Sequence, residues 1–354
     1  MPTDTGDPEK RVDLVFEGGG VKGIALAGAF SVLEEQGFRT QNVAGTSAGA
    51  VVGSLVAAGY SAKELYDILQ ETPFSSFQDE GWEDRIIGLG MPLSILKDHG
   101  IYEGKVFHGW LRERLAEKGI SRFGDLKIAG EDDARWMYKL QVVVSDVTHH
   151  QLLLLPRDAK VLGKDPDDLE VADAVRMSMS IPIFFEPFTV KTSGEDIILV
   201  DGGMLSNFPV WVFDSDGVPD YPTFGLKLVD PAPKTVEPGE APDLPTKHSA
   251  LKELITYLLG LVGTMTDSHD KIYLERDSFV RTITISNLGV KATEFNLSRD
   301  TSEALYRAGQ DAASTFLESW DFAAYKVAFR TGMDQPTRRE AVTSRMEAAA
   351  AGQS

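Results

Sequence analysis

The sequence of 354 residues contains no cysteine. Disulfide bonds and thiolate metal sites are therefore excluded. The absence of cysteine does not indicate whether the protein works in an oxidising or a reducing compartment. No uninterrupted apolar run reaches the roughly 18 residues that span a membrane as a helix, because the longest candidate, residues 254–265, is too short. The polar start, MPTDTGDPEKR, does not resemble a Sec signal peptide. We therefore expect a cytoplasmic protein, with non-Sec export or peripheral membrane association as alternatives.

Basic residues are in the minority. The sequence has 35 Lys and Arg residues and 54 Asp and Glu residues, which gives a formal net charge of −19. A surface this acidic repels polyphosphates and argues against nucleic-acid binding. It also opposes adsorption to anionic membranes by charge, so any lipid contact must depend on apolar side chains. Residues 86–96 and 254–265 are candidates for that contact or for an acyl groove, although each is equally compatible with a core helix. The oligomeric state is not predicted.

The segment around Ser47 organises the interpretation of the chain. Gly45, Ser47 and Gly49 form a G-x-S-x-G pattern between a predicted strand, residues 41–44, and a predicted helix, residues 48–58. Glycines at the flanking positions remove Cβ atoms that would clash where a strand turns directly into a helix, and such a strained turn exposes the serine hydroxyl. The free N–H groups of the helix would face an oxyanion formed there. The pattern alone is equally compatible with a tightly packed strand–helix junction.

A glycine-rich loop is predicted at the end of the strand 12–17. It holds Gly18, Gly19 and Gly20, and Gly23 follows in the first turn of a helix. If this strand and the strand before Ser47 are parallel neighbours, the loop lies beside the serine. The backbone amides of the loop would then provide an oxyanion hole.

The same loop also fits the G-x-G-x-x-G pattern of dinucleotide sites. That fingerprint requires an acidic residue at the end of the second strand, where it binds the ribose hydroxyls. The second predicted strand instead runs into Ala44, Gly45 and Thr46. A nucleotide cofactor is therefore disfavoured. Lys22, in the first turn of the helix that follows, is interpreted as a solvated surface lysine rather than as a partner of a lipid phosphate.

An acidic residue follows another apolar strand. Asp201 comes directly after the predicted strand 196–200 and precedes Gly202 and Gly203. The carboxyl ends of parallel strands share one edge of a sheet, so Asp201 is predicted to lie on the edge that carries Ser47. A carboxylate in that place is a candidate general base.

Histidine provides the main alternative base. No histidine of this sequence lies in a glycine-framed turn after a strand; the six are His99, His108, His149, His150, His248 and His269. His248 and His269 follow in the Ser…Asp…His order of triad hydrolases, so an esterase using one of them stays open. A third alternative, from a different class, is a non-catalytic lipid- or acyl-binding module.

Strands alternate with helices along the chain, which predicts one α/β domain over residues 10–330 with right-handed crossovers. The tail, 331–354, is predicted to be helical or frayed. Residues 72–100 are irregular, and the proline-rich residues 230–247 are predicted to form a mobile surface loop. Further strands are predicted at 139–144, 151–155, 223–229 and 279–286, and further helices at 21–35, 62–70, 105–118, 169–178, 248–265 and 298–320.

Taken together, these motifs resemble the patatin-like phospholipase family. The resemblance rests on GGGVKG at 18–23, GTSAG at 45–49 and DGG at 201–203, with the block AVRMSMSIPIFFEPF before the acid, and it covers residues 12–229. It implies a three-layer α/β/α fold with a mainly parallel central sheet. The implied activity is hydrolysis of ester bonds in phospholipids or other acyl lipids through an acyl-enzyme, without a metal or cofactor.

The resemblance also implies roles for individual residues. Ser47 would be the nucleophile and Asp201 its base, without a catalytic histidine. The oxyanion hole would be formed by the amides of three consecutive glycines, Gly18, Gly19 and Gly20. Other glycines would support the motifs, namely Gly23, Gly45, Gly49, Gly202 and Gly203.

Overall fold

The computed structural model describes residues 10–72, 100–102, 104–192, 194–215, 217–231, 276–290, 294 and 297–331. Its elements in chain order are β1 (Arg11–Phe16), α1 (Gly23–Glu35), β2 (Arg39–Thr46), α2 (Ala48–Ala57), α3 (Ala62–Glu71), β3 (Gly100–Tyr102), α6 (Lys105–Glu117), β4 (Leu140–Asp146), β5 (Gln151–Leu155), α7 (Val171–Ser178), β6 (Ile183–Phe185), β7 (Phe188–Lys191), β8 (Asp196–Asp201), β9 (Thr223–Val229), α9 (Arg276–Val280), β10 (Thr282–Ser286), α10 (Arg299–Ser319) and α11 (Phe322–Phe329). The 3₁₀ turns of the chain include η2 (Gly20–Lys22), η6 (Gly202–Met204) and η7 (Val210–Phe213).

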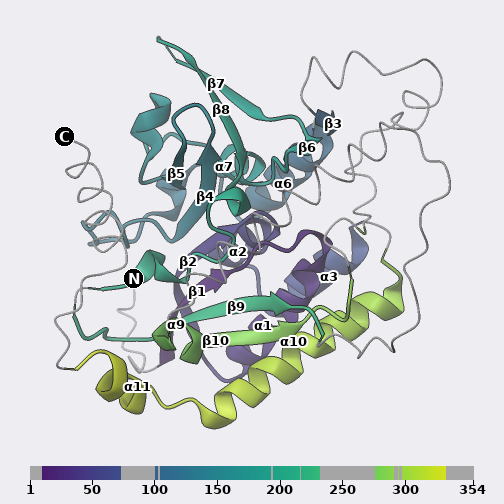
Figure 1. Ribbon diagram of the computed structural model, residues 1–354, viewed down its shortest axis with the longest axis vertical. Coiled ribbons are helices and arrows are strands. Elements are labelled where there is room, and N and C mark those ends of the chain that lie inside the picture. The colour runs from purple at the N-terminus through teal and green to yellow at the C-terminus, as the bar shows by residue number, and fades with distance from the viewer. Residues whose placement is uncertain are drawn as a thin grey trace, which may run out of the picture.

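The central sheet is mixed but mainly parallel. Its strand order is β10-β9-β1-β2-β4-β8-β7, and β5 also pairs with β4. The strands from β10 to β4 are all parallel to their neighbours. In contrast, β5 and β8 are antiparallel to β4, and β7 is antiparallel to β8. β7 and β8 form a hairpin that projects from the body of the molecule (Figure 1). The predicted fold class, a mainly parallel sheet with flanking helices, is confirmed.

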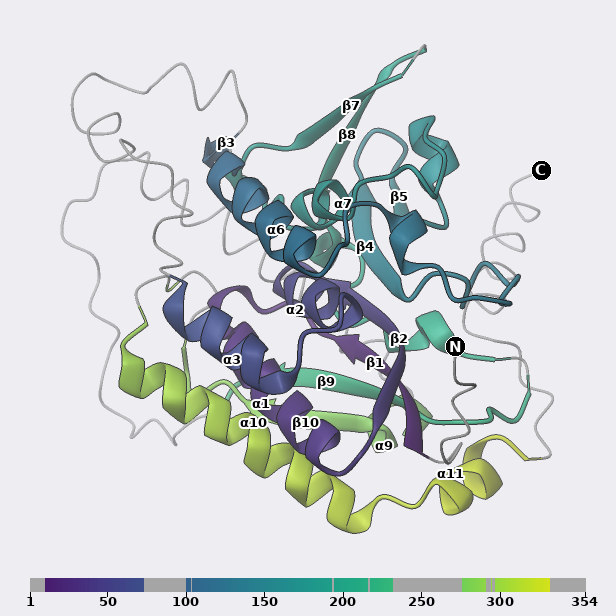
Figure 2. The same ribbon diagram turned by 180° about the vertical axis from the view of Figure 1, so that it is seen from behind.

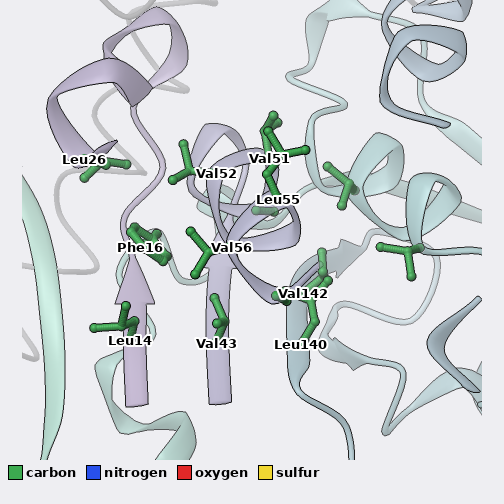
Figure 3. Close-up of a cluster of buried hydrophobic side chains, with 14 of the residues drawn as sticks. Leu14, Phe16, Leu26, Val43, Val51, Val52, Leu55, Val56, Leu140 and Val142 are labelled. Atoms are coloured by element: carbon green, nitrogen blue, oxygen red, sulfur yellow. The ribbon is translucent and has the colours of Figure 1, made fainter. Parts of the chain in front are cut away.

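Helices cover one face of this sheet. The largest apolar cluster joins the strands to α1, α2, α3, α6, α7 and α10, and Figure 2 shows α1, α2, α3 and α6 in front of the strands. Figure 3 shows the centre of the cluster, where Val52, Leu55 and Val56 of α2 approach Phe16 and Val43. These side chains are almost fully buried. Each Å² of apolar area buried in this way contributes about 25 cal/mol to stability, and this burial holds α2 against the sheet.

The opposite face carries a second, smaller cluster. Val15, Ala44 and Val143 alternate with the residues that face the helices, as the period of two in a strand requires. They pack against Phe208 and the apolar side chains of η7. The chain segment that follows Asp201 is therefore anchored on this face, immediately beside the strands that end at the glycine-rich loop and at Ser47.

The predicted strand 279–286 starts too early. Residues up to Val280 belong to α9, and β10 begins only at Thr282, whose Oγ1 donates a hydrogen bond to the Ser278 carbonyl. Phe279 is 62% exposed, so its apolar side chain does not join the sheet. β7 and α11 were not predicted.

Several predictions lie outside the described residues. They concern the irregular segment apart from its first and last residues, the proline-rich loop apart from its first two residues, the helix 248–265, the tail after residue 331, and His99, His248 and His269. Within the described part of the chain, no helix is long and apolar enough to cross a membrane.

Candidate active site

Ser47 lies at a strained turn between β2 and α2. Its φ of 53° and ψ of −127° are unusual for a residue with a side chain, and such a backbone costs about 1–3 kcal/mol. The turn is held from outside, because the Ser47 amide donates to Ser178 Oγ at 2.8 Å and that hydroxyl donates to the Val143 carbonyl at 2.6 Å. Ser178 thereby links the turn to β4.

Glycine is required on both sides of this turn. A Cβ atom at Gly49 would lie 2.2 Å from the Phe16 carbonyl oxygen, and one at Gly45 would lie 2.4 Å from the Gly49 carbonyl oxygen. Both distances are far below van der Waals contact. The first turn of α2 therefore packs directly on the end of β1, and this packing brings Ser47 to the glycine-rich loop.

The glycine-rich loop lies beside Ser47. A Cβ atom at Gly18 would be 3.2 Å from the Ser47 Cβ, and Gly20 has a φ of 60°, which favours glycine. Gly23 packs against α2, where an added Cβ would lie 3.2 Å from Val52 Cγ2. The loop and the serine are thus brought together by β1 and β2, which are parallel neighbours as predicted.

The three amides of the loop are not equivalent. The Gly18 amide donates to the Asn207 carbonyl at 3.1 Å, so it is already engaged, and its predicted contribution to an oxyanion hole would require this bond to break. Within the described residues, the amides of Gly19 and Gly20 donate no hydrogen bond. These two amides are therefore the donors that the loop offers to a ligand near Ser47.

Asp201 reaches Ser47 from an unexpected direction. The expectation that it ends a parallel strand is wrong, because β8 is antiparallel to β4. Thr46 of β2 pairs with Val143 of β4, and the next residue of β4, Val144, pairs with Asp201. Because β5 pairs with the other edge of β4, β2 and β8 follow one another along the same edge of β4, and Ser47 and Asp201 lie next to each other there. Gly202 then passes so close to β4 that an added Cβ would lie 2.3 Å from the Val143 carbonyl oxygen.

The Asp201 carboxyl group is buried and incompletely hydrogen-bonded. Its Oδ1 accepts a hydrogen bond of 2.7 Å from the Gly203 amide, whereas its Oδ2 has no partner among the described residues. Burial raises the pKa of Asp201 to about 6, and the neighbouring Ser47 hydroxyl and Gly203 amide oppose this rise. The Ser47 hydroxyl itself donates to Met179 Sδ at 3.6 Å. The site thus holds a carboxylate whose free oxygen is available to a nearby proton donor.

Neighbouring polar groups position these residues, and the sequence analysis did not identify them. Thr46 Oγ1 donates to the Ser206 carbonyl at 3.0 Å, and the Asp201 amide donates to the Ser180 carbonyl at 2.9 Å. Arg176 Nη1 donates to Ser180 Oγ at 2.6 Å. Ser178, Ser180 and Arg176 belong to the block AVRMSMSIPIFFEPF, which was noted only for its resemblance. No sequence signal singled out Asn207.

The described histidines lie elsewhere. His108 bonds to Asp173, and His149 bonds to Asp146 and Glu195. None of the histidines in the described ranges is hydrogen-bonded to Ser47 or Asp201. His108, Glu170 and Asp173 group closely enough to hold a cation, but Lys164 and Arg112 form ion pairs with the two acids. This cluster is separate from the serine site.

A mainly parallel sheet with a serine on a strained strand–helix turn is typical of α/β enzymes that use a serine nucleophile. Comparison with known proteins gives the family. The family described as patatin-like phospholipase matches residues 14–214, and the chain belongs to this family.

The chain is also similar to individual known proteins. The uncharacterized protein YqhO of Bacillus subtilis (strain 168) is 37% identical over 311 residues, which cover 88% of this chain and 99% of YqhO. Probable lipid hydrolase 463L of Invertebrate iridescent virus 6 is 22% identical over 57% of this chain and 63% of that protein. The crystal structure of VipD from Legionella pneumophila matches with a TM-score of 0.49 and 18% identity, covering 90% of this chain and 69% of VipD. The family and the lipid hydrolase relative support a lipid hydrolase activity.

Proposed function

We propose that this protein hydrolyses ester bonds of phospholipids or other acyl lipids through a Ser47–Asp201 dyad. The observation that carries the proposal is the sheet register, in which the strained serine and the buried carboxylate follow one another along the same edge of β4. Family membership supports the substrate class. The substrates would be phospholipids or lysophospholipids, cleaved at an acyl ester.

In the first step, the Ser47 hydroxyl attacks the acyl carbonyl and Asp201 accepts its proton. A carboxylate with an ordinary pKa near 4 is a weak base at neutral pH. Because the pKa of Asp201 is raised to about 6, its carboxylate is a stronger base there. The hydroxyl must turn from Met179 Sδ toward the free Oδ2 of Asp201, which requires only a side-chain rotation.

The negative charge that develops on the carbonyl oxygen needs donors. The Gly19 and Gly20 amides, which donate no hydrogen bond within the described residues, and the amides at the start of α2 would provide them, and each oxyanion donor contributes about 3–4 kcal/mol. Collapse of the tetrahedral intermediate releases the lyso-lipid or alcohol, which takes the proton from Asp201. Water then hydrolyses the acyl-enzyme, again with Asp201 as base.

Labelling with a fluorophosphonate tests whether Ser47 is a nucleophile. We expect stoichiometric labelling of the intact protein, with the modification mapped by mass spectrometry to the peptide that contains Ser47. Ser54→Ala is a matched control, because Ser54 is buried in the same segment and donates only to the Val51 carbonyl. Ser54→Ala should label like the wild type. Absence of labelling in both proteins would favour the non-catalytic lipid-binding module.

Replacing each histidine separately by alanine distinguishes a dyad from a triad. We expect every variant to keep at least about half of the wild-type kcat/KM, because the described geometry needs no imidazole beside Asp201. His248 and His269 are the decisive positions. A loss of about 10⁴-fold at either one, the effect of disabling a catalytic base, would replace the dyad by a Ser-His-Asp mechanism. Hydrolysis of a short-chain ester provides the measurement.

A further inference from the structure

Asn207 holds the first residue of the glycine-rich loop from both sides. Its backbone carbonyl accepts a hydrogen bond from the Gly18 amide, and its side-chain Nδ2 donates one to the Gly18 carbonyl, each at 3.1 Å. Asn207 is buried, and a Cβ atom at Gly18 would lie 2.2 Å from its Oδ1. Both polar backbone groups of Gly18 are therefore fixed by a single residue distant in sequence.

The bond to the Gly18 carbonyl also determines where the next amide points. The peptide between Gly18 and Gly19 is planar and trans, so its C=O and its N–H point in opposite directions. While Nδ2 of Asn207 holds the carbonyl on one side, the Gly19 N–H is held facing the other. Glycines on both sides of this peptide would otherwise let it rotate at little cost, because they accept dihedral angles that other residues avoid.

The same chain segment buttresses the serine turn. The Ser206 carbonyl, adjacent to Asn207, accepts the hydrogen bond from Thr46 Oγ1. Asp201 begins the segment, and Phe208 anchors its other end in the second apolar cluster. One short, packed segment thus carries the carboxylate, supports the residue before Ser47 and holds the glycine-rich loop.

We propose that Asn207 is a positioning residue that directs the Gly19 amide toward the oxyanion formed at Ser47. The inference rests on the proposed acyl transfer at Ser47 and extends it, because it assigns the orientation of the oxyanion hole to a side chain that touches no reacting atom. Asn207 acts only through the Gly18–Gly19 peptide. Its loss should weaken binding of the tetrahedral transition state and leave binding of the ester substrate nearly unchanged.

The test compares Asn207→Ala and Asn207→Asp with the wild type. The aspartate keeps the side-chain volume and the backbone contacts but cannot donate to the Gly18 carbonyl when ionised. For both variants we expect kcat to fall about 100-fold, the size of the loss of one oxyanion donor, with KM within about threefold of the wild type. Affinity for a trifluoromethyl ketone, whose serine adduct carries an oxyanion, should fall by a similar factor.

Asn287→Ala is the matched control. Asn287 is also buried, follows a strand end and donates through Nδ2 to Asp230 at 2.5 Å, away from the glycine-rich loop. Its loss should lower the melting temperature as much as Asn207→Ala does while leaving kcat and ketone affinity near wild-type values. If Asn207→Ala does not fold, Asn207→Asp carries the same comparison.

Two results would overturn the inference, and they differ from a failure of the proposed function. The first is an Asn207 variant whose kcat and ketone affinity match those of Asn287→Ala. The second is a loss expressed in KM alone, which would indicate a role in substrate binding. If the wild type itself neither hydrolyses esters nor binds the ketone, the proposed function fails, and the positioning role fails with it.

Discussion

Ser47→Ala is expected to abolish ester hydrolysis, lowering kcat about 10⁶-fold and thus to the background of the assay. The nearby Ser178 hydroxyl does not take its place, because it is engaged by both the Ser47 amide and the Val143 carbonyl. Removing the nucleophile leaves the oxyanion donors without a reacting atom to act on. Hydrolysis of a fluorogenic ester and of phospholipid vesicles, followed by product analysis, provides the measurement.

A matched variant separates chemistry from folding at this position. Alanine keeps a Cβ at a φ of 53°, whereas glycine adopts this backbone without strain. Ser47→Gly should therefore be as inactive as Ser47→Ala but more stable by about 1 kcal/mol. Wild-type-like turnover in either variant would end the enzyme hypothesis.

Asp201→Asn is expected to lower kcat/KM by about 10²–10⁴-fold, the usual contribution of a general base. The amide is nearly the same size and can still accept the hydrogen bond from Gly203, so the loss reports on proton transfer. In the wild type, kcat/KM should rise with pH and level off above an apparent pKa of about 6, the value to which burial raises the pKa of Asp201. The residual kcat/KM of Asp201→Asn should not show this rise with pH.

The same substitution should stabilise the protein. The pKa of Asp201 is about 6 in the folded state against an ordinary value of 3.8, so the folded state binds this proton more tightly than the unfolded state does. The contribution of Asp201 to stability is therefore fully present below about pH 4 and is lost as the pH rises through 6. At pH 7 this shift of about two pKa units costs about 3 kcal/mol. The amide introduced by Asp201→Asn does not titrate anywhere in this range.

Denaturant unfolding at several pH values checks this prediction. Asp201→Asn should match the wild type near pH 4 and be more stable by about 1–3 kcal/mol at pH 7–8, since the new amide N–H must also find an acceptor. An inactive but stabilised variant would identify Asp201 as a strained functional residue. A variant that is destabilised at pH 7 would show that the carboxylate holds the fold together instead.

Local features of the fold were predictable where nearby residues decide them. Ser61, directly before the predicted helix 62–70, forms a capping box with Glu64, whose Oε2 accepts a hydrogen bond from the Ser61 amide at 2.8 Å, because both partners lie within one helical turn. The turn at Ser47 and the helix after it follow from the spacing of Gly45 and Gly49. In these cases the interacting groups are separated by only a few residues, so sequence spacing translates directly into geometry.

Features that depend on strand direction were not predictable in this way. Asp201 was expected beside Ser47 for the wrong reason, because an apolar strand followed by Asp-Gly-Gly looks the same in a parallel and in an antiparallel strand. β8 is antiparallel to both β7 and β4, and the pairing of Val144 with Asp201 determines where along β4 the carboxylate lies. Asn207 was missed because its partner, Gly18, lies 189 residues earlier.

The sequence by itself determined the α/β class, the strained serine turn and the residue types available for acyl transfer, since glycine spacing and hydrophobic period act over short distances. Only the tertiary structure decided which groups meet. It reversed the strand that carries Asp201, engaged the Gly18 amide and left those of Gly19 and Gly20 as donors. These outcomes depend on strand order and on packing between distant segments, where the burial of the whole core outweighs any local preference.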